Sequence, residues 1–233
     1  MLGVLINVAA VLVGGTLGLL LGGRVPQRLR DTVMQGLALC VMLIGAQGAL
    51  STADVLVVIV CIVAGGLLGE LLNIEKGLES LGGAAEKKFS HGGRSGSFAQ
   101  AFITASLLFC VGAMAVVGPL TAGLTGDNST LIAKAALDFV SSLFFAAALG
   151  PGVLLSASVV LVYQGAIALL AGLLAPVLTD AIITEMSAVG GLLIVGLGIN
   201  MLGITKIRVG NLLPAIFVPI LYFPLANWIG GLL

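Results

Sequence analysis

The chain has 233 residues, of which 59% are hydrophobic and only 9% are charged, and its formal net charge is zero. Soluble domains have about 25% charged residues, so the composition excludes an ordinary water-soluble domain and indicates an integral membrane protein. The balanced charge, without a basic stripe, gives no reason to expect nucleic acid as a partner. We therefore expect an all-α transmembrane helix bundle that forms a single domain over residues 1–233, with the lipid bilayer around it.

Apolar runs predict about eight membrane-spanning helices, because about 20 apolar residues are needed to cross the hydrocarbon core. In chain order the expected spans are 2–22, 33–50, 53–72, 99–120, 130–149, 152–174, 187–204 and 211–231. The fifth and sixth spans are joined only by Gly150, Pro151 and Gly152. They form either a tight hairpin or a pair in which one member is a broken or re-entrant helix.

Similar glycine-containing strings recur in the first, third and seventh spans: VGGTLG at 13–18, AGGLLG at 64–69 and VGGLLI at 189–194. They indicate either duplicated helical hairpins, with the first two and the next two spans as sister units, or chance matches in a biased composition. In both cases the GxxxG spacing of Gly14 with Gly18 and of Gly65 with Gly69 favours close helix contact, within the chain or between protomers. We expect a homo-oligomer, with a dimer as the default.

The positions of Lys and Arg predict the orientation in the membrane. Nine of the ten basic residues fall in three loops, which follow the first, third and seventh spans. By the positive-inside rule these loops, including 73–98, are cytoplasmic and both termini lie outside. The N-terminal run lacks the basic start of a cleaved signal peptide, so we expect a retained first helix. The loops on the opposite side carry only acidic residues, which are Asp54, Asp127, Asp180 and Glu185.

Lys134 and Asp138 place opposite charges one helical turn apart inside the apolar run 130–149. A charge at the bilayer centre costs about 2.5–3.5 kcal/mol, so buried ionisable residues are candidates for function. Lys134 would lie about 6 Å and Asp138 about 12 Å below the outer edge of the core. Ser141 and Ser142 continue the same helix face. The pair is either an ion pair that neutralises itself and locks the bundle, or a cation or proton site at Asp138 that Lys134 holds in one state.

Further polar residues within the spans are distributed from one membrane face to the other. Each one alone is typical of an interhelical hydrogen bond, whereas together they would supply a hydrated path. The last span contains Pro214, Pro219 and Pro224, which predict a bent helix, either for packing or for lining a cavity. The remaining candidates for an ion or solute pathway are Asn7, Gln47, Glu70, Gln164, Asn200 and Asn211.

No motif indicates catalysis, a cofactor or a metal. Cys40, Cys61 and Cys110 lie inside apolar spans, where cysteine behaves as a small hydrophobe, and no Cys/His spacing predicts a metal site. The single histidine, His91, lies in an expected cytoplasmic loop, and Ser/His, HExxH and GxSxG patterns are missing from the sequence. We therefore expect a protein that is not an enzyme.

The chain resembles one family through the strings GVLINVAAVLVGG, LLGELLNIEKG, GDNSTLIAKAALDF, SAVGGLLIVGLG and VGNLLPA, which run from the first span to the last. These strings are similar to the YqgA/YdfK-like family, a domain-of-unknown-function group of bacterial inner-membrane proteins. The resemblance implies a polytopic protein of the bacterial cytoplasmic membrane, but it brings no activity with it. It also implies that Asn7, Glu70, Asp127, Lys134 and Asp138 are motif positions.

Two functional classes fit these observations. The first is a transporter or channel for a small ion or polar solute, with proton coupling through Asp138 or Glu70 as one form of it. The membrane-embedded polar residues and the kinked, glycine-rich helices favour this class. The alternative is a non-transporting membrane scaffold or accessory subunit, whose glycine faces bind another membrane protein.

Overall fold

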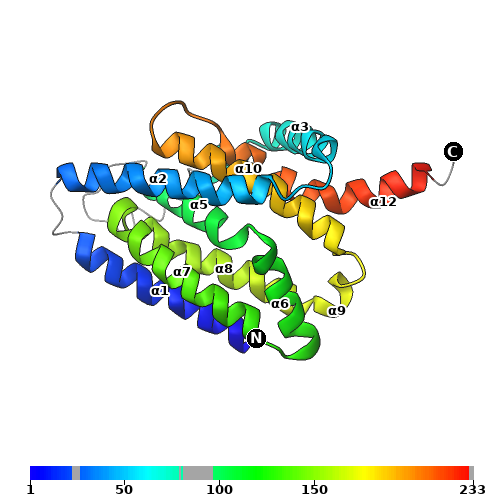
Figure 1. Cartoon of the computed structure of the whole chain (residues 1–233), viewed down its shortest axis with the longest axis horizontal. Coiled ribbons are helices and arrows are strands. Elements are labelled where there is room, and N and C mark those ends of the chain that lie inside the picture. The colour runs from blue at the N-terminus through cyan, green and yellow to red at the C-terminus, as the bar shows by residue number, and fades with distance from the viewer. Residues whose placement is uncertain (23–26, 79, 81–96, 231–233) are drawn as a thin grey trace.

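The structure is a computed structural model that describes residues 1–22, 27–78, 80 and 97–230. In the described part of the chain every regular element is a helix (Figure 1). The elements are α1 (Leu2–Gly22), α2 (Gln27–Ala49), α3 (Val55–Leu72), α5 (Ser97–Cys110), α6 (Ala113–Thr125), α7 (Ser129–Leu149), α8 (Gly152–Leu169), α9 (Ala171–Leu174), α10 (Asp180–Met201), α11 (Val209–Leu212), the 3-10 helix η1 (Leu213–Phe217) and α12 (Val218–Gly230).

The number of membrane spans agrees with the sequence. Among the described residues, seven helical stretches are long and apolar enough to cross a membrane, and the pair α5–α6, taken as one bent span, makes eight. The all-α fold and the count of about eight spans are therefore confirmed.

The helices form two groups that lie side by side along the long axis of the molecule (Figure 1). The α7 group consists of α1, α5, α6, α7, α8 and α9, and the α10 group consists of α2, α3, α10, α11, η1 and α12. Within the α7 group, α1 packs along the whole of α7 while α5 packs on α8. Contact between the groups is slight by comparison and includes Val111, beside the α5–α6 break, against Gly190 of α10.

Glycines set the closest helix contacts. A Cβ atom at Gly14 or Gly18 of α1 would collide with the backbone of α7 at Phe139 or Leu143, so α1 and α7 run parallel at backbone contact. In the same way a Cβ atom at Gly69 of α3 would collide with Asn211. Small residues permit such close approach between membrane helices, as their spacing predicts. The glycine faces of α1 and α3 are thus occupied by different partners within the chain, and hairpin duplication stays a prediction.

These packing directions give the bundle two distinct ends. The described basic residues outside α7 lie at one end, which we call the basic end, and they are Arg28, Arg30, Lys76, Lys206 and Arg208. The N-terminus, the start of α7 and the start of α10 lie at the opposite end, which we call the terminus end (Figure 1). The alternation of helix directions expected from the charge pattern is therefore present. The expected loop 73–98, which carries His91, lies largely outside the described residues.

The expected span 99–120 is broken in the structure. Helices α5 and α6 meet at a bend of 59° around Val111 and Gly112. Gly112 has φ +108° and ψ 154°, a backbone conformation that essentially only glycine adopts. The apolar run alone contains no sign of this break, because the conformation of one glycine causes it rather than a change in hydropathy.

Three other expected boundaries are refined. Helices α7 and α8 form a tight hairpin at Gly150 (φ +96°), so both are complete helices rather than one broken span. Helix α10 begins at Asp180 rather than at 187, because the Thr179 side chain caps it by accepting from the backbone N–H of Ile182. The last span is interrupted at Pro214, which lies in the 3-10 segment η1 between α11 and α12, and a bend of this span stays a prediction.

The break at Gly112 gives a first prediction. Gly112→Ala is expected to lower the free energy of unfolding by about 1–3 kcal/mol, because alanine is strained at this φ and ψ. A Cβ atom at Gly112 meets nothing within 4 Å, so the cost would come from the backbone and not from a clash. Gly36→Ala in helix α2, where a Cβ atom also meets nothing within 4 Å, is the matched control and should be neutral or stabilising. Unfolding in mixed detergent micelles measures both variants, and equal stability would contradict the assignment of strain.

Candidate functional site

Lys134 and Asp138 form a buried ion pair on helix α7. The Lys134 Nζ atom donates to Asp138 Oδ1 at 2.8 Å and to Oδ2 at 2.7 Å. Each residue is only 5% exposed, so the two charges are neutralised by one another and not by water. The sequence prediction that these residues pair across one turn is confirmed.

Two amide side chains complete the site from neighbouring helices. Asn7 of α1 donates through Nδ2 to Gln164 Oε1 of α8 at 3.1 Å, and both residues are fully buried. The Asn7 side chain also interacts with the Asp138 carboxylate. Two polar atoms of these amides lack a hydrogen-bond partner, Asn7 Oδ1 and Gln164 Nε2. We call Asn7, Lys134, Asp138 and Gln164 the polar cluster.

Packing on both sides closes the polar cluster. Toward the terminus end it is covered by four buried apolar residues, each of which belongs to a helix of the α7 group. We call them the apolar plug, and they are Val4, Ala122, Leu131 and Ala168. Toward the basic end the contact between α1 and α7 tightens at Gly14, whose position leaves no room for a side chain beside Ser142. The polar cluster is thus occluded from both ends.

The α5–α6 break lies close to the polar cluster. Cys110, the last residue of α5, is within electrostatic range of both Lys134 and Asp138. Backbone carbonyls at the end of a helix have no intrahelical partners, and at membrane depth they must meet protein, water or an ion. In membrane transporters the ends of broken helices contribute to substrate and ion sites.

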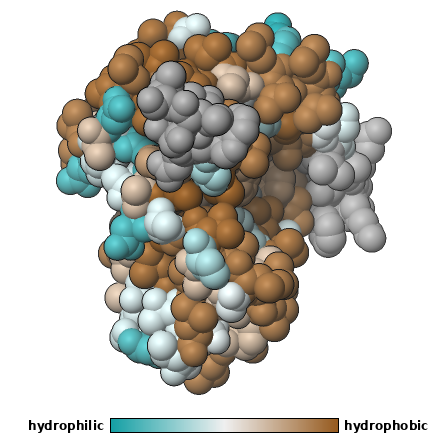
Figure 2. Space-filling model, turned by 90° about the vertical axis from the view of Figure 1, so that its right-hand side faces the viewer, coloured by the Kyte–Doolittle hydropathy of each residue, from teal (hydrophilic) through white to brown (hydrophobic). Residues whose placement is uncertain are grey.

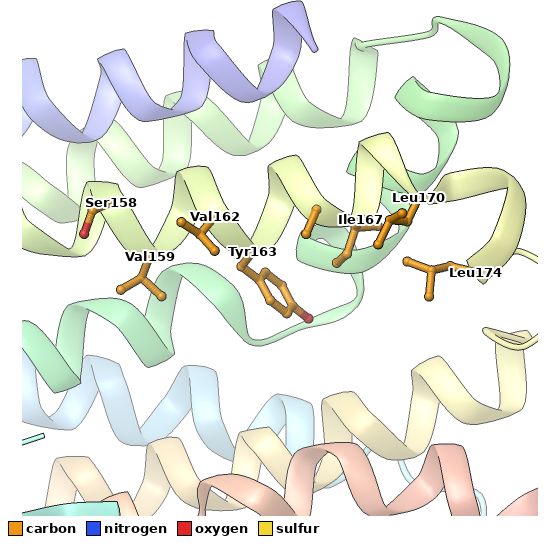
Figure 3. A pocket seen from close by; sticks show the side chains of 8 residues that line it. Ser158, Val159, Val162, Tyr163, Ile167, Leu170 and Leu174 are labelled. Carbon is orange, nitrogen blue, oxygen red and sulfur yellow. The ribbon is translucent and has the colours of Figure 1, made fainter. Parts of the chain in front are cut away.

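An apolar groove of about 500 Å³ borders the opposite side of α8. Its lining comes from α8 and α9, and Val159, Val162 and Tyr163 project into it (Figure 3). The surface between the two helix groups is also hollowed and mostly apolar when the molecule is viewed from its terminus end (Figure 2). Gln164 of the polar cluster and Tyr163 of the groove are neighbours in α8. Only the thickness of this one helix therefore separates the polar cluster from the groove.

A second polar group joins α3 to α11 at the basic end. The Glu70 carboxylate accepts from Arg208 Nη1 at 2.7 Å and from Asn211 Nδ2 at 2.6 Å. Asn211 Oδ1 accepts from the backbone N–H of Glu75 at 2.8 Å. The Arg208 and Glu70 side chains are 67% and 54% exposed, and an exposed ion pair contributes only about 0–1 kcal/mol. This group fixes the loop after α3, and each oxygen of the Glu70 carboxylate accepts a hydrogen bond.

The other sequence candidates lie apart from the polar cluster. Ser142 is buried one turn beyond Asp138, but its hydroxyl donates to the Phe139 carbonyl at 2.9 Å. Ser141 is half-buried, and Gln47 is exposed on α2. Asn200 ties the loop after α10, because it donates to the Ile207 carbonyl and accepts from its N–H, both at 2.8 Å.

Glu185 has a role that the sequence does not predict. The charge pattern places it in a loop on the side opposite the basic loops, but it lies inside α10 and is 1% exposed. Its carboxylate accepts from the Thr52 hydroxyl at 2.7 Å and from the Ala53 N–H at 2.8 Å, so it fastens the α2–α3 loop. Thr179 followed by Asp180 is a helix N-cap signal with an acidic first turn. A helix that begins at this signal would include Glu185.

Two hydroxyls of α5 were also missed. Thr104 Oγ1 and Ser106 Oγ are buried without a hydrogen-bond partner. Serine and threonine in helices often bond to the carbonyl one turn earlier, so unbonded hydroxyls are unusual. The described residues contain no group of three or more His, Cys, Asp or Glu side chains that could hold a metal ion.

Comparison with known proteins places the chain in a family. A family model described as "Protein of unknown function (DUF554)" matches residues 2–223. The chain is 34% identical over 220 residues to "Uncharacterized protein YqgA" of Escherichia coli (strain K12), with 93% of this chain and 94% of the relative covered. It is 30% identical over 223 residues to "Uncharacterized membrane protein YdfK" of Bacillus subtilis (strain 168), with 94% of each covered. No solved structure matches.

The ion pair gives a second prediction. Lys134→Ala is expected to lower the free energy of unfolding by about 3–5 kcal/mol, because it leaves the Asp138 carboxylate buried without a counter-charge. Replacing both members, Lys134→Met with Asp138→Leu, should restore stability close to that of the wild type. Unfolding in mixed detergent micelles measures the series, with the exposed Lys76→Ala as control. If the double variant is as unstable as Lys134→Ala, the unpaired Asp138 charge is not the cause of the lost stability.

Asp127, just before α7, gives a third prediction. Its carboxylate accepts from the Ser129 N–H at 2.9 Å and from the Ser129 hydroxyl at 3.1 Å, and these bonds lower the pKa of Asp127 below its usual value of 3.8. A lowered folded-state pKa contributes stability above the unfolded pKa, and this contribution is lost as pH falls through the folded pKa. The wild type should therefore be more stable than Asp127→Asn at pH 7, and the difference should shrink as the pH falls below about 4, vanishing once the pH lies below the folded-state pKa. Thermal unfolding measured from pH 7 downward tests this, and a difference independent of pH would refute it.

Proposed function

We propose that this chain, a member of the DUF554 family with several helices apolar enough to cross a membrane, moves a small ion or polar solute across the bilayer through the polar cluster. The observation that carries this proposal is the pair of unpartnered amide atoms, Asn7 Oδ1 and Gln164 Nε2, beside the buried ion pair. An unpartnered buried polar group costs about 1–3 kcal/mol. A bound solute would supply the missing hydrogen bonds, which gives a physical reason for tolerating that cost.

A purely structural role accounts less well for the same residues. An ion pair that only locked the bundle would need no further polar groups, and apolar residues of similar volume would pack at least as well. Instead α1 and α8 each direct a fully buried amide to this point. The polar groups therefore converge from three helices, as a binding site requires.

Occlusion from both ends fits a transport cycle. A membrane carrier must open its site to one side at a time, and in this structure the apolar plug covers one side while the α1–α7 contact at Gly14 covers the other. The α5–α6 break supplies a place where a helix half could move without unwinding a continuous helix. We propose that the plug opens toward the terminus end and that the opposite opening involves the helix packing near Ser142.

Orientation and assembly belong to the same proposal. We place the protein in the bacterial cytoplasmic membrane, with the basic end in the cytoplasm and both termini outside. A dimer remains our expectation by base rate alone, because the α1 and α3 glycine faces that motivated it pack inside the chain. For the same reason those faces no longer favour the scaffold alternative. A carrier of this kind needs no catalytic residue.

The fourth prediction tests transport directly. Purified wild-type protein in liposomes should accelerate the flux of at least one member of a panel of small ions and polar solutes. Asp138→Asn and Gln164→Leu should each reduce this flux about tenfold or more, because each removes a group that would contact the solute. Gln47→Leu is the matched control, since it makes the same change at an exposed span position outside the polar cluster, and it should retain wild-type flux.

Two results would decide against transport. The first is wild-type protein that is folded in liposomes yet moves no member of the panel. The second is an Asp138→Asn variant with unchanged flux. If the inactive wild type also purifies with a stoichiometric membrane-protein partner, the scaffold alternative replaces the carrier.

A further inference from the structure

We propose that the polar cluster is a monovalent-cation site, and that the Lys134 ammonium competes with the transported cation for the Asp138 carboxylate. This inference rests on the proposed function and names its substrate class. In the structure the ammonium occupies the position of the cation. When a cation binds to Asp138, Lys134 withdraws toward the terminus end.

The contacts of Lys134 describe the cation position. Its Nζ atom bridges both oxygens of Asp138, at 2.8 and 2.7 Å, so one unit of positive charge is held by one carboxylate. An ammonium group has three donors, and both hydrogen bonds that Nζ donates to described residues go to this carboxylate. The amide oxygen Asn7 Oδ1, on a side chain that interacts with Asp138, is buried and unpartnered. A bare cation would use this oxygen as a ligand.

The donor set favours a hard monovalent ion. The available atoms are carboxylate and amide oxygens from Asp138, Asn7 and Gln164, and oxygen ligands suit hard cations rather than soft metals. Gln164 Oε1 currently accepts from Asn7, and both amides can rotate to offer oxygen. One carboxylate balances one positive charge, whereas a divalent ion would leave an uncompensated charge in a buried site.

Lys134 has a route out of the cluster. It lies within the first two turns of α7, and a lysine side chain is long enough to carry its ammonium toward the membrane surface from that depth. Asp127 lies two turns earlier along the same direction, exposed and anionic at neutral pH. Leu131 of the apolar plug stands between the two positions. Withdrawal of Lys134 therefore requires movement of the plug, which links cation binding to opening.

The fifth prediction compares salts at constant ionic strength. Full-length protein in detergent is titrated with NaCl or KCl against choline chloride, and the thermal midpoint is followed. In Lys134→Gln the half-saturating cation concentration should fall about tenfold or more, because the internal competitor is gone. The cation should also rescue the stability of this variant. Asp138→Asn and the double variant Lys134→Met with Asp138→Leu should show no cation-specific shift, and Gln47→Leu should respond like the wild type.

A second measurement uses the wild type alone. An impermeant amine-reactive reagent should modify Lys134 faster in Na⁺ or K⁺ than in choline, because the cation displaces the ammonium from a site where the residue is 5% exposed. Exposed Lys76 is the internal control and should be modified at the same rate in every salt. Mass spectrometry of the two peptides reports both rates.

The outcomes separate this inference from the proposed function. Two results overturn the competition between Lys134 and the cation for Asp138, even if liposome flux is observed. One is labelling of Lys134 at the same rate in every salt, and the other is a cation-specific shift of the thermal midpoint that persists in Asp138→Asn. Cation-dependent labelling in a protein without flux supports the site and overturns transport instead.

Discussion

The requirement that buried charges find partners inside the protein governs the centre of this molecule. Water cannot solvate Asp138 at membrane depth, so the carboxylate depends on Lys134 and on the Asn7 amide. Asn7 reaches it because α1 and α7 run parallel at backbone contact, which in turn depends on glycines at 14 and 18. A local ion pair and a long-range helix contact are thus parts of one arrangement.

The backbone obeys the same requirement. Helices satisfy their own N–H and C=O groups, and interruptions of a helix are tolerated in a membrane only where protein or a polar cavity receives the freed groups. Both interruptions described here contact other helices: Val111 at the α5–α6 break packs against Gly190 of α10, and η1 packs against α3. Proline produces the second interruption, whereas the φ of Gly112 produces the first.

The two helix groups differ in how they use their polar residues. In the α10 group the carboxylates of Glu185 and Glu70 are fully bonded and hold loops in place at opposite ends. In the α7 group the Asn7 and Gln164 amides keep unpartnered atoms. The two helix groups contact one another only slightly, and an apolar groove lies beside α8. These two features fit a division in which the α10 group is a rigid support and the α7 group binds the proposed solute. This division is consistent with placing the proposed transport site in the α7 group.

The sequence by itself determined the class of protein, the number of spans, the alternation of their directions and the Lys134–Asp138 pair. These features follow from composition, from hydropathy over about 20 residues and from the spacing of one helical turn, all of which are local properties. Only the tertiary structure decided that Asn7 and Gln164 join that pair while Gln47 and Asn200 do not, because helix rotation and the choice of neighbours depend on contacts between distant segments. The break at Gly112 and the burial of Glu185 escaped the sequence for the same reason: one glycine's φ and one loop's hydrogen bonds leave hydropathy unchanged.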